Sequence, residues 1–117
     1  MDALKFYELF KTLQTIAGEN KEGFTYNLKE RKLQSNGFAV ARRETQNSHN
    51  ESGMMSCLVY ALQNDILCVG GWYDNKSGKF YFDATEIHNN KQEAEEAAKE
   101  NAQLAYFDLN TCTEIRL

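Results

Sequence analysis

The chain of 117 residues has no proline, few cysteines and no long apolar run. Without proline it has no polyproline recognition segment, and its turns depend on glycine and asparagine. No apolar stretch approaches the roughly 18 residues that a membrane-spanning helix needs. Charged residues interrupt the first ten positions, so we expect no secretory signal peptide. These absences predict a protein without a membrane partner.

The three cysteines and two histidines form no recognisable site motif. Cys57, Cys68 and Cys112 lie far apart, with no C-x-x-C pair. Reduced, mostly buried thiols in a cytoplasmic protein are the simplest interpretation. His49 and His88 add no spacing that is typical of zinc ligands. Glycine patterns that cradle phosphate are also missing, so we expect neither a metal nor a cofactor.

The charge balance is mildly acidic. The chain has 17 Asp and Glu residues against 13 Lys and Arg residues, a formal net charge of −4. This charge is too small for a DNA mimic and has the wrong sign for a simple phosphate binder. With 42% hydrophobic and 26% charged residues, the composition predicts one globular domain over residues 1–117 that folds without metal or disulfides.

Apolar spacing predicts a first helix over residues 2–17. Apolar side chains recur there every three or four residues, which makes one stripe on an amphipathic helix. Asp2 suits the N-cap, and Gly18 suits the position just after the helix. The stripe is expected to pack on a sheet, although its aromatic side chains would also suit docking onto a partner.

Two further helices are predicted. Residues 53–64 read as a short, largely buried helix with Ser52 as its N-cap. Residues 91–101 follow Asn90, which has capping-box spacing to Glu93. The apolar stripe of this last helix contains only alanine, so it can approach a sheet closely while its glutamates stay in water.

The first predicted hairpin joins residues 23–28 to residues 38–43. Residues 23–28 alternate apolar and polar side chains, as a strand with one buried face does. A polar loop follows and ends in Asn36-Gly37, a strong turn signal. Residues 38–43 are then expected to return as the second strand.

The second predicted hairpin is the clearest feature of the sequence. Residues 66–73 and 79–87 are apolar, aromatic and β-branched, and they flank the polar turn 74–78. Both faces of these strands are apolar, which indicates that both are covered or that a partner covers one. Gly70-Gly71 in mid-strand indicates a bulge or a close backbone approach.

The remaining segments complete an α+β domain. Residues 104–109 predict a strand, and residues 114–117 an edge strand that leaves open a homodimer through that edge. Strands that arrive as hairpins predict an antiparallel or mixed sheet. We expect two hairpins and a C-terminal strand, with about three helices packed mainly on one face.

Aromatic side chains concentrate in the second hairpin. Five fall within fewer than a dozen positions, namely Trp72, Tyr73, Phe80, Tyr81 and Phe82. If Trp72 and Tyr81, or Tyr73, keep exposed ring surface, they form an anchor patch for a protein partner. The alternative is that helices cover both faces of the hairpin and all of these rings belong to the core.

A basic set of residues suggests nucleic acid as another partner. It consists of Lys29, Arg31 and Lys32 with Arg42 and Arg43. The set is small, interrupted by an acidic residue and carried by an acidic chain. A solvated loop is the simpler explanation of these residues.

Three aspartates offer acid–base chemistry, a further alternative. Asp83 lies on the returning strand of the second hairpin, and Asp108 lies on the strand after the last helix. The two would lie close together if that strand paired beside the hairpin. Asp74 is most simply an Asx-turn residue. An enzyme would need at least two of these carboxyl groups in one concave pocket.

The second half of the chain resembles a known domain. The stretches VGGWYDNKSGKFYFDATEI, EAEEAAKENAQLAYFDL and EIRL resemble a small accessory domain of phages, conjugative elements and large polyvalent proteins, typified by GGW-D-x-x-T-G-K-x-Y-x-D and N-Q-x-A-I-F-D-L. Ser77 stands where that pattern has Thr, and Ala105-Tyr106 stands where it has Ala-Ile. The similarity covers most of residues 23–117.

The resemblance implies a setting but assigns no catalytic residue. It implies a cytoplasmic life in a bacterial cell that hosts a mobile element. Together with the aromatic hairpin and the lack of a catalytic motif, this setting predicts a non-enzymatic accessory protein that binds another protein, in regulation or in modulation of host defence.

Overall fold

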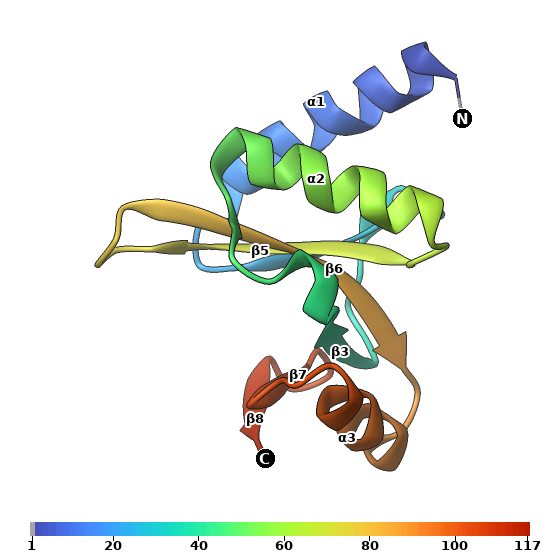
Figure 1. Cartoon of the computed structure of the whole chain (residues 1–117), viewed down its shortest axis with the longest axis vertical. Coiled ribbons are helices and arrows are strands. Elements are labelled where there is room, and N and C mark those ends of the chain that lie inside the picture. Colours follow the sequence, from blue (N-terminus) through green and yellow to red (C-terminus); the bar gives the residue numbers. More distant parts are fainter. Residues whose placement is uncertain (1) are drawn as a thin grey trace.

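A computed structural model describes residues 2–117 (Figure 1). It confirms the α+β class, with three helices packed on a curled antiparallel sheet. The helices are α1 (Ala3–Glu19), α2 (Asn50–Gln63) and α3 (Lys91–Glu100). The strands are β1 (Phe24–Asn27), β2 (Lys32–Leu33), β3 (Phe38–Ala41), β4 (Ser48–His49), β5 (Cys68–Asp74), β6 (Lys79–His88), β7 (Ala105–Asp108) and β8 (Thr113–Arg116), and a 3-10 helix η1 (Arg43–Thr45) precedes β4. Among the described residues, no helix is both long and apolar enough to cross a membrane.

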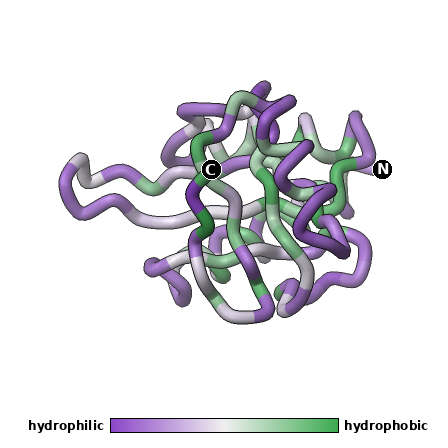
Figure 2. Tube along the Cα trace, turned by 90° about the horizontal axis from the view of Figure 1, so that it is seen from below, coloured by the Kyte–Doolittle hydropathy of each residue, from purple (hydrophilic) through white to green (hydrophobic). Residues whose placement is uncertain are grey.

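The β5–β6 hairpin forms the centre of the sheet. The strand order is β2-β1-β5-β6-β3-β7-β8, and β4 pairs with β6 outside this path. One edge of β6 pairs with β5, while β4 and β3 share the other edge. The end of the hairpin projects from the body of the molecule with a hydrophilic tip (Figure 2). The second predicted hairpin is thus confirmed.

The first predicted hairpin is wrong. Residues 23–28 contain β1, which pairs with β5, whereas residues 38–43 contain β3, which pairs with β6 and β7. The loop between them contains β2, Lys32–Leu33, which pairs with β1. A turn signal such as Asn36-Gly37 marks a reversal of the chain but does not choose the neighbouring strand. The apolar strands β5 and β6 offer β1 and β3 more buried contact than the two could offer each other.

Two apolar clusters pack on the sheet. The larger one lies between α1, α2 and the sheet and includes the fully buried Leu9, Leu13, Leu58 and Val69. The smaller one lies between α3 and strands β3 and β7, at the other end of the sheet (Figure 1). It consists of Val40, Ala94, Ala97, Ala98 and Tyr106, with Phe38 and Ile115 packed against it. The predicted alanine stripe of α3 is confirmed.

Strand alternation gives β6 two different faces. Phe82 and Ala84 point toward α1 and α2, so we call their side of the sheet the helix face. Tyr81, Asp83 and Thr85 alternate with them and point to the opposite side, which we call the open face. The expectation that the helices pack mainly on one face agrees with this arrangement.

The ends of α1 and α3 test the capping predictions. Asp2 is the N-cap of α1, and its carboxylate accepts a hydrogen bond from the backbone N of Lys5 at 2.9 Å. Asn90 caps α3 through the backbone N of Glu93, also at 2.9 Å. Gly18 was expected just after α1 but lies inside it, because the helix continues to Glu19 and ends at Asn20.

The start of α2 differs from the prediction. The helix begins at Asn50 with His49 as its N-cap residue, rather than after Ser52. His49 also pairs with Tyr81, so the chain passes directly from strand β4 into the helix. Pairing of β4 with β6 therefore sets the start of α2, and the local capping signal of Ser52 does not.

Gly70 and Gly71 lie on opposite faces of β5 and have different roles. The register of β5 with β6 is unbroken, so there is no bulge between them. Gly71 lies on the helix face, where a Cβ would come within 2.7 Å of a ring atom of Phe24 and 2.9 Å of one of Phe82. The predicted close approach is confirmed, and its cause is ring packing against the backbone.

Replacing Gly71 tests this close approach. Gly71→Ala is expected to lower the free energy of unfolding by about 1–3 kcal/mol, because two packed rings must move. Gly18→Ala is the control, since a Cβ there meets nothing within 4 Å and alanine favours the helix, by roughly 0.5–1 kcal/mol. Urea unfolding measures both changes. Equal effects of the two substitutions would contradict the packing role of Gly71.

Candidate functional site

The open face of the β5–β6 hairpin carries a ladder of cross-strand pairs. From the centre of the sheet to the hairpin tip, the pairs are Cys68–Thr85, Gly70–Asp83, Trp72–Tyr81 and Asp74–Lys79. The rings of Trp72 and Tyr81 stack, with centroids 5.5 Å apart and planes at 26°. Trp72 keeps 47% of its surface exposed. The hairpin therefore presents an ordered aromatic pair to solvent.

A cavity of about 420 Å³ lies beside this aromatic pair. The hairpin contributes Trp72, Tyr81 and Asp83 to its lining, and the segment around η1 contributes Thr45 and Asn47. Thr45 holds that segment in place. Its hydroxyl accepts a hydrogen bond from the backbone N of Ala84 at 2.9 Å, between the parts of β6 that pair with β4 and with β3.

Asp83 lines the cavity without a cationic partner. The Thr85 hydroxyl donates a hydrogen bond to its carboxylate. Burial raises the pKa of Asp83, against the opposing effect of that hydrogen bond. Across residues 2–117, no Lys, Arg or His nitrogen lies within ion-pair distance of this carboxylate. This half-buried carboxylate is therefore partly desolvated and has no cationic partner in the part of the chain that the structure describes.

Asp74 lines the same cavity but lies nearer the hairpin tip. Its carboxylate accepts a hydrogen bond from the backbone N of Lys76 at 3.2 Å, so the predicted Asx turn is confirmed. Hydrogen bonds from the Ser77 hydroxyl and from Lys76 lower the pKa of Asp74. Asp74 and Asp83 are two open-face pairs apart, about 14 Å along the strands, with the aromatic pair between them. The two carboxyl groups are therefore too far apart to act on the same atom of a substrate.

Two other predicted site residues lie elsewhere. Asp108 was expected near Asp83 if β7 paired beside the hairpin, but β7 pairs with β3, and Asp108 accepts a hydrogen bond from Asn110. That expectation is wrong because β3 lies between β6 and β7. Tyr73 lies on the helix face, near Phe80, so it does not join Trp72 in one patch.

The structure adds His49 to the aromatic pair. His49 on β4 is the register partner of Tyr81 and meets its ring edge to face, with centroids 6.0 Å apart. His49, Tyr81 and Trp72 thus form a row across three strands. His49 Nδ1 is buried and has no hydrogen-bond partner among the described residues. From the sequence, His49 was a candidate only for metal binding, because nothing in its polar segment indicated a strand beside the hairpin.

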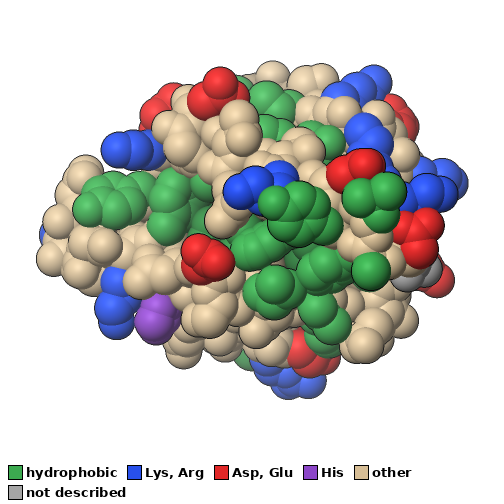
Figure 3. Space-filling model, turned by 90° about the horizontal axis from the view of Figure 1, so that it is seen from above, with side chains coloured by type: hydrophobic (Ala, Val, Ile, Leu, Met, Phe, Trp, Pro, Cys, Tyr) green, Lys and Arg blue, Asp and Glu red, His purple; other side chains and the backbone are tan. Residues whose placement is uncertain are grey.

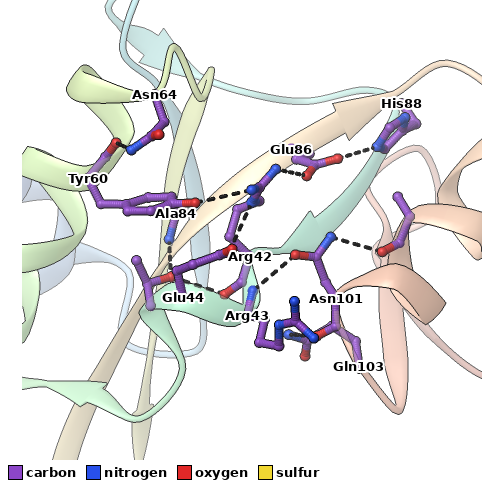
Figure 4. Close-up of polar contacts among 12 residues, drawn as sticks. Arg42, Arg43, Glu44, Tyr60, Asn64, Ala84, Glu86, His88, Asn101 and Gln103 are labelled. Atoms are coloured by element: carbon purple, nitrogen blue, oxygen red, sulfur yellow. Dashed lines mark hydrogen bonds and ion pairs between the residues drawn. The ribbon is translucent and has the colours of Figure 1, made fainter.

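Arg42 is the centre of a polar network at one side of the cavity (Figure 4). Its Nη1 donates to Glu86 Oε2 at 2.7 Å, its Nη2 donates to the Tyr60 hydroxyl at 3.1 Å, and its Nε lies 3.3 Å from Glu44 Oε1. Glu86 also lies 2.8 Å from His88 Nε2. The network joins the end of β3 to β6 and α2. The positive charge of Arg42 is thus already paired with the carboxylates of Glu86 and Glu44.

The predicted basic set is not brought together. Lys29, Arg31 and Lys32 lie at or next to β2, and strands β1, β5 and β6 separate β2 from β3, which precedes Arg42 and Arg43. Lys32 pairs with Glu30 at 3.1 Å. A continuous basic surface is therefore not formed by these five residues.

The cysteines are separate in the structure. Cys57 and Cys68 are buried, and burial raises the pKa of their thiols to about 11 and about 12. Cys112 is exposed. Within the described part of the chain, no three His, Cys, Asp or Glu side chains form a group that could hold a metal ion.

Another apolar surface lies over the helices. Viewed from the side of α1 and α2, hydrophobic side chains gather on that face of the molecule (Figure 3). Leu4 and Tyr7 of α1 are 68% and 59% exposed. This surface corresponds to the predicted alternative in which α1 docks onto a partner.

Comparisons with models of protein families, with curated proteins and with solved structures find no match to this chain. The candidate site therefore depends on its own geometry. That geometry combines a stacked, exposed aromatic pair with an adjacent cavity that contains a desolvated carboxylate.

Asp83→Asn tests the cost of that carboxylate. A raised pKa means that the folded state loses stability as the pH rises from about 3.9, the unfolded value, through the folded pKa. Asparagine avoids this cost and still accepts the Thr85 hydrogen bond. The variant should therefore be more stable than the wild type at neutral pH and equal to it below about pH 4. Thermal unfolding across pH measures this, and a less stable variant at neutral pH would contradict it.

Glu86→Gln tests the Arg42 network with the opposite sign. Burial alone would raise the pKa of Glu86, but its contacts with His88 and Arg42 hold it below the ordinary value. Its stabilisation is thus present above about pH 4.3 and is lost as the pH falls further. We expect the variant to lose about 1–2 kcal/mol at neutral pH in urea unfolding. Glu44→Gln, at the exposed contact, should change little. Equal losses would refute the role of Glu86.

Proposed function

We propose that this protein is a non-enzymatic accessory protein of a bacterial mobile element that binds another protein through the open face of the β5–β6 hairpin. The supporting observation is the stacked Trp72–Tyr81 pair, in which Trp72 remains 47% exposed. The bacterial, mobile-element setting, with a role in regulation or host defence, depends on the sequence resemblance alone, and the cytoplasmic setting also on the unpaired cysteines.

Physical reasoning favours the aromatic pair as a binding anchor. Large aromatic side chains dominate interface energetics, because they bury much surface with few rotatable bonds. Stacking on Tyr81, which itself meets His49, already restricts the Trp72 ring. Binding would therefore cost little additional side-chain entropy. The projecting hairpin also gives a partner access to this face (Figure 2).

The two alternative functions have weaker support. Acid–base chemistry is favoured by one observation, the shared cavity of Asp74 and Asp83, whose pKa values shift in opposite directions. Paired carboxylates in glycoside hydrolysis lie only about 5–9.5 Å apart, whereas these two lie on either side of the aromatic pair. Nucleic-acid binding lacks a continuous basic surface, and the charge of Arg42 is engaged by Glu86.

A capture experiment with Trp72→Ala tests the proposed function. The wild-type protein, immobilised, is expected to retain a bacterial protein that excess free wild type competes away. Trp72→Ala should lose at least about 2 kcal/mol of binding at unchanged thermal stability. Titration of the purified partner measures that loss.

Tyr7→Ala is the matched control, since it removes an exposed ring from α1, far from the cavity lining. It should bind as the wild type does. If no saturable partner appears, or if Trp72→Ala and Tyr7→Ala behave alike, the hairpin is not the binding surface.

A further inference from the structure

Asp83 is a negative group that the fold desolvates without supplying a counter-charge. Within the described chain, the only hydrogen bond to its carboxylate comes from the Thr85 hydroxyl. Arg42 lines the same cavity, but its guanidinium group contacts Glu86, Glu44 and Tyr60. Burying an unpaired carboxylate costs free energy, so a ligand that brings a positive charge would recover part of that cost.

The space beside this carboxylate is free of a side chain because the residue opposite Asp83 is Gly70. Gly70 is the register partner of Asp83 on the open face, so any other residue would place a side chain beside the carboxylate. A Cβ at Gly70 would come within 3.1 Å of Thr85 Oγ1 and 3.3 Å of Asp83 Oδ1. The two adjacent glycines thus serve opposite faces, because Gly71 admits the core rings and Gly70 places no side chain beside the Asp83 carboxylate.

The next pair along the ladder supplies aromatic surface. Trp72 and Tyr81 lie about 7 Å from the Gly70–Asp83 pair, one step of two residues along the strands. A planar cation can stack on an aromatic ring and donate two parallel hydrogen bonds to a carboxylate. Guanidinium combines these properties, whereas ammonium does not.

We infer that the cavity receives the guanidinium group of an arginine from the bound partner, stacked on the Trp72–Tyr81 pair and paired with the carboxylate of Asp83. The inference deepens the proposed function and rests on it for the identity of the ligand as a protein. Charge complementarity supports it, since the chain has a net charge of −4 and Asp74 adds a second carboxylate to the cavity lining. Lys76 and Lys79 lie near Asp74 at the tip, whereas Asp83 lies two pairs further from them along the ladder.

Trp72 provides a direct measurement, because it is the only tryptophan of the chain. N-acetyl-arginine amide is titrated into the protein at about 0.15 M salt, where nonspecific attraction between exposed charges is screened, and Trp72 fluorescence is recorded. A saturable change with a millimolar dissociation constant is expected for a ligand of this size. N-acetyl-citrulline amide, the neutral analogue of the same shape, should give no saturable change.

Two variants test the carboxylate and the space beside it. Asp83→Asn should bind the arginine amide at least tenfold more weakly, although it is expected to be the more stable protein at neutral pH. Gly70→Ala should abolish the saturable change by filling the space in front of the carboxylate. Asp108→Asn removes the same charge outside the cavity and should titrate as the wild type does. Thermal unfolding of each variant verifies that it is folded.

The outcomes separate this inference from the proposed function. If citrulline and arginine amides titrate alike, or Asp83→Asn binds arginine as tightly as the wild type, the guanidinium site is refuted. Capture of a partner that depends on Trp72 would then leave the binding function standing. Conversely, a specific arginine titration combined with Trp72-independent capture would keep the guanidinium site and remove the proposed role of the hairpin in partner binding.

Discussion

The unbroken antiparallel pairing of β5 with β6 builds two different surfaces from one hairpin, because successive residues of a strand point to opposite faces. On the helix face, Val69, Phe82 and Ala84 become part of the larger core. On the open face, Trp72 and Asp83 alternate with them and remain available to a ligand. A shift of one residue in the register would exchange these two sets. Both the core and the candidate site therefore depend on the same hydrogen-bonded ladder.

The second strand of that hairpin also connects the two ends of the molecule. The first half of β6 packs under α2, and its last residues pair with β3, on which α3 packs. At the junction, Arg42 contacts Glu86 of β6 and Tyr60 of α2 (Figure 4). Close to the same point, the backbone N of Arg43 donates to Asn101, which follows α3. Each of the two ends of the molecule is stabilised by its own apolar cluster. The polar contacts of Arg42 and Arg43 join these two ends.

Local signals in the sequence predicted most elements but not all of their partners. The alternating apolar runs around residues 74–78 predicted the central hairpin, and the alanine spacing predicted the buried stripe of α3. The neighbours of β1 and β3 were not predictable from Asn36-Gly37, because strand pairing across the chain depends on how much apolar surface each neighbour offers. For the site, strand alternation separates Trp72 from Tyr73, but the sequence left open which of the two rings keeps exposed surface.

The polar part of the site was the least predictable. Thr45 and Asn47 belong to a segment without apolar residues, whose position depends on hydrogen bonds to β6. The importance of Asp83 depends on the lack of a side chain opposite it at Gly70, which only the register shows. Asp108 seemed its closest counterpart in the sequence, but the insertion of β3 between β6 and β7 separates them.

The unequal size of the two clusters has a consequence for the dynamics of the chain. The cluster under α3 buries three alanines of that helix, whereas the cluster under α1 and α2 buries leucines and rings. Less apolar area holds the C-terminal part, so its opening costs less free energy than unfolding of the whole domain. Backbone amides of α3 and β8 would then exchange with solvent deuterium before those of β5. Gln103, just after α3, lines one side of the cavity. Each opening of the C-terminal part would therefore disturb the cavity, and a ligand bound there would slow that opening.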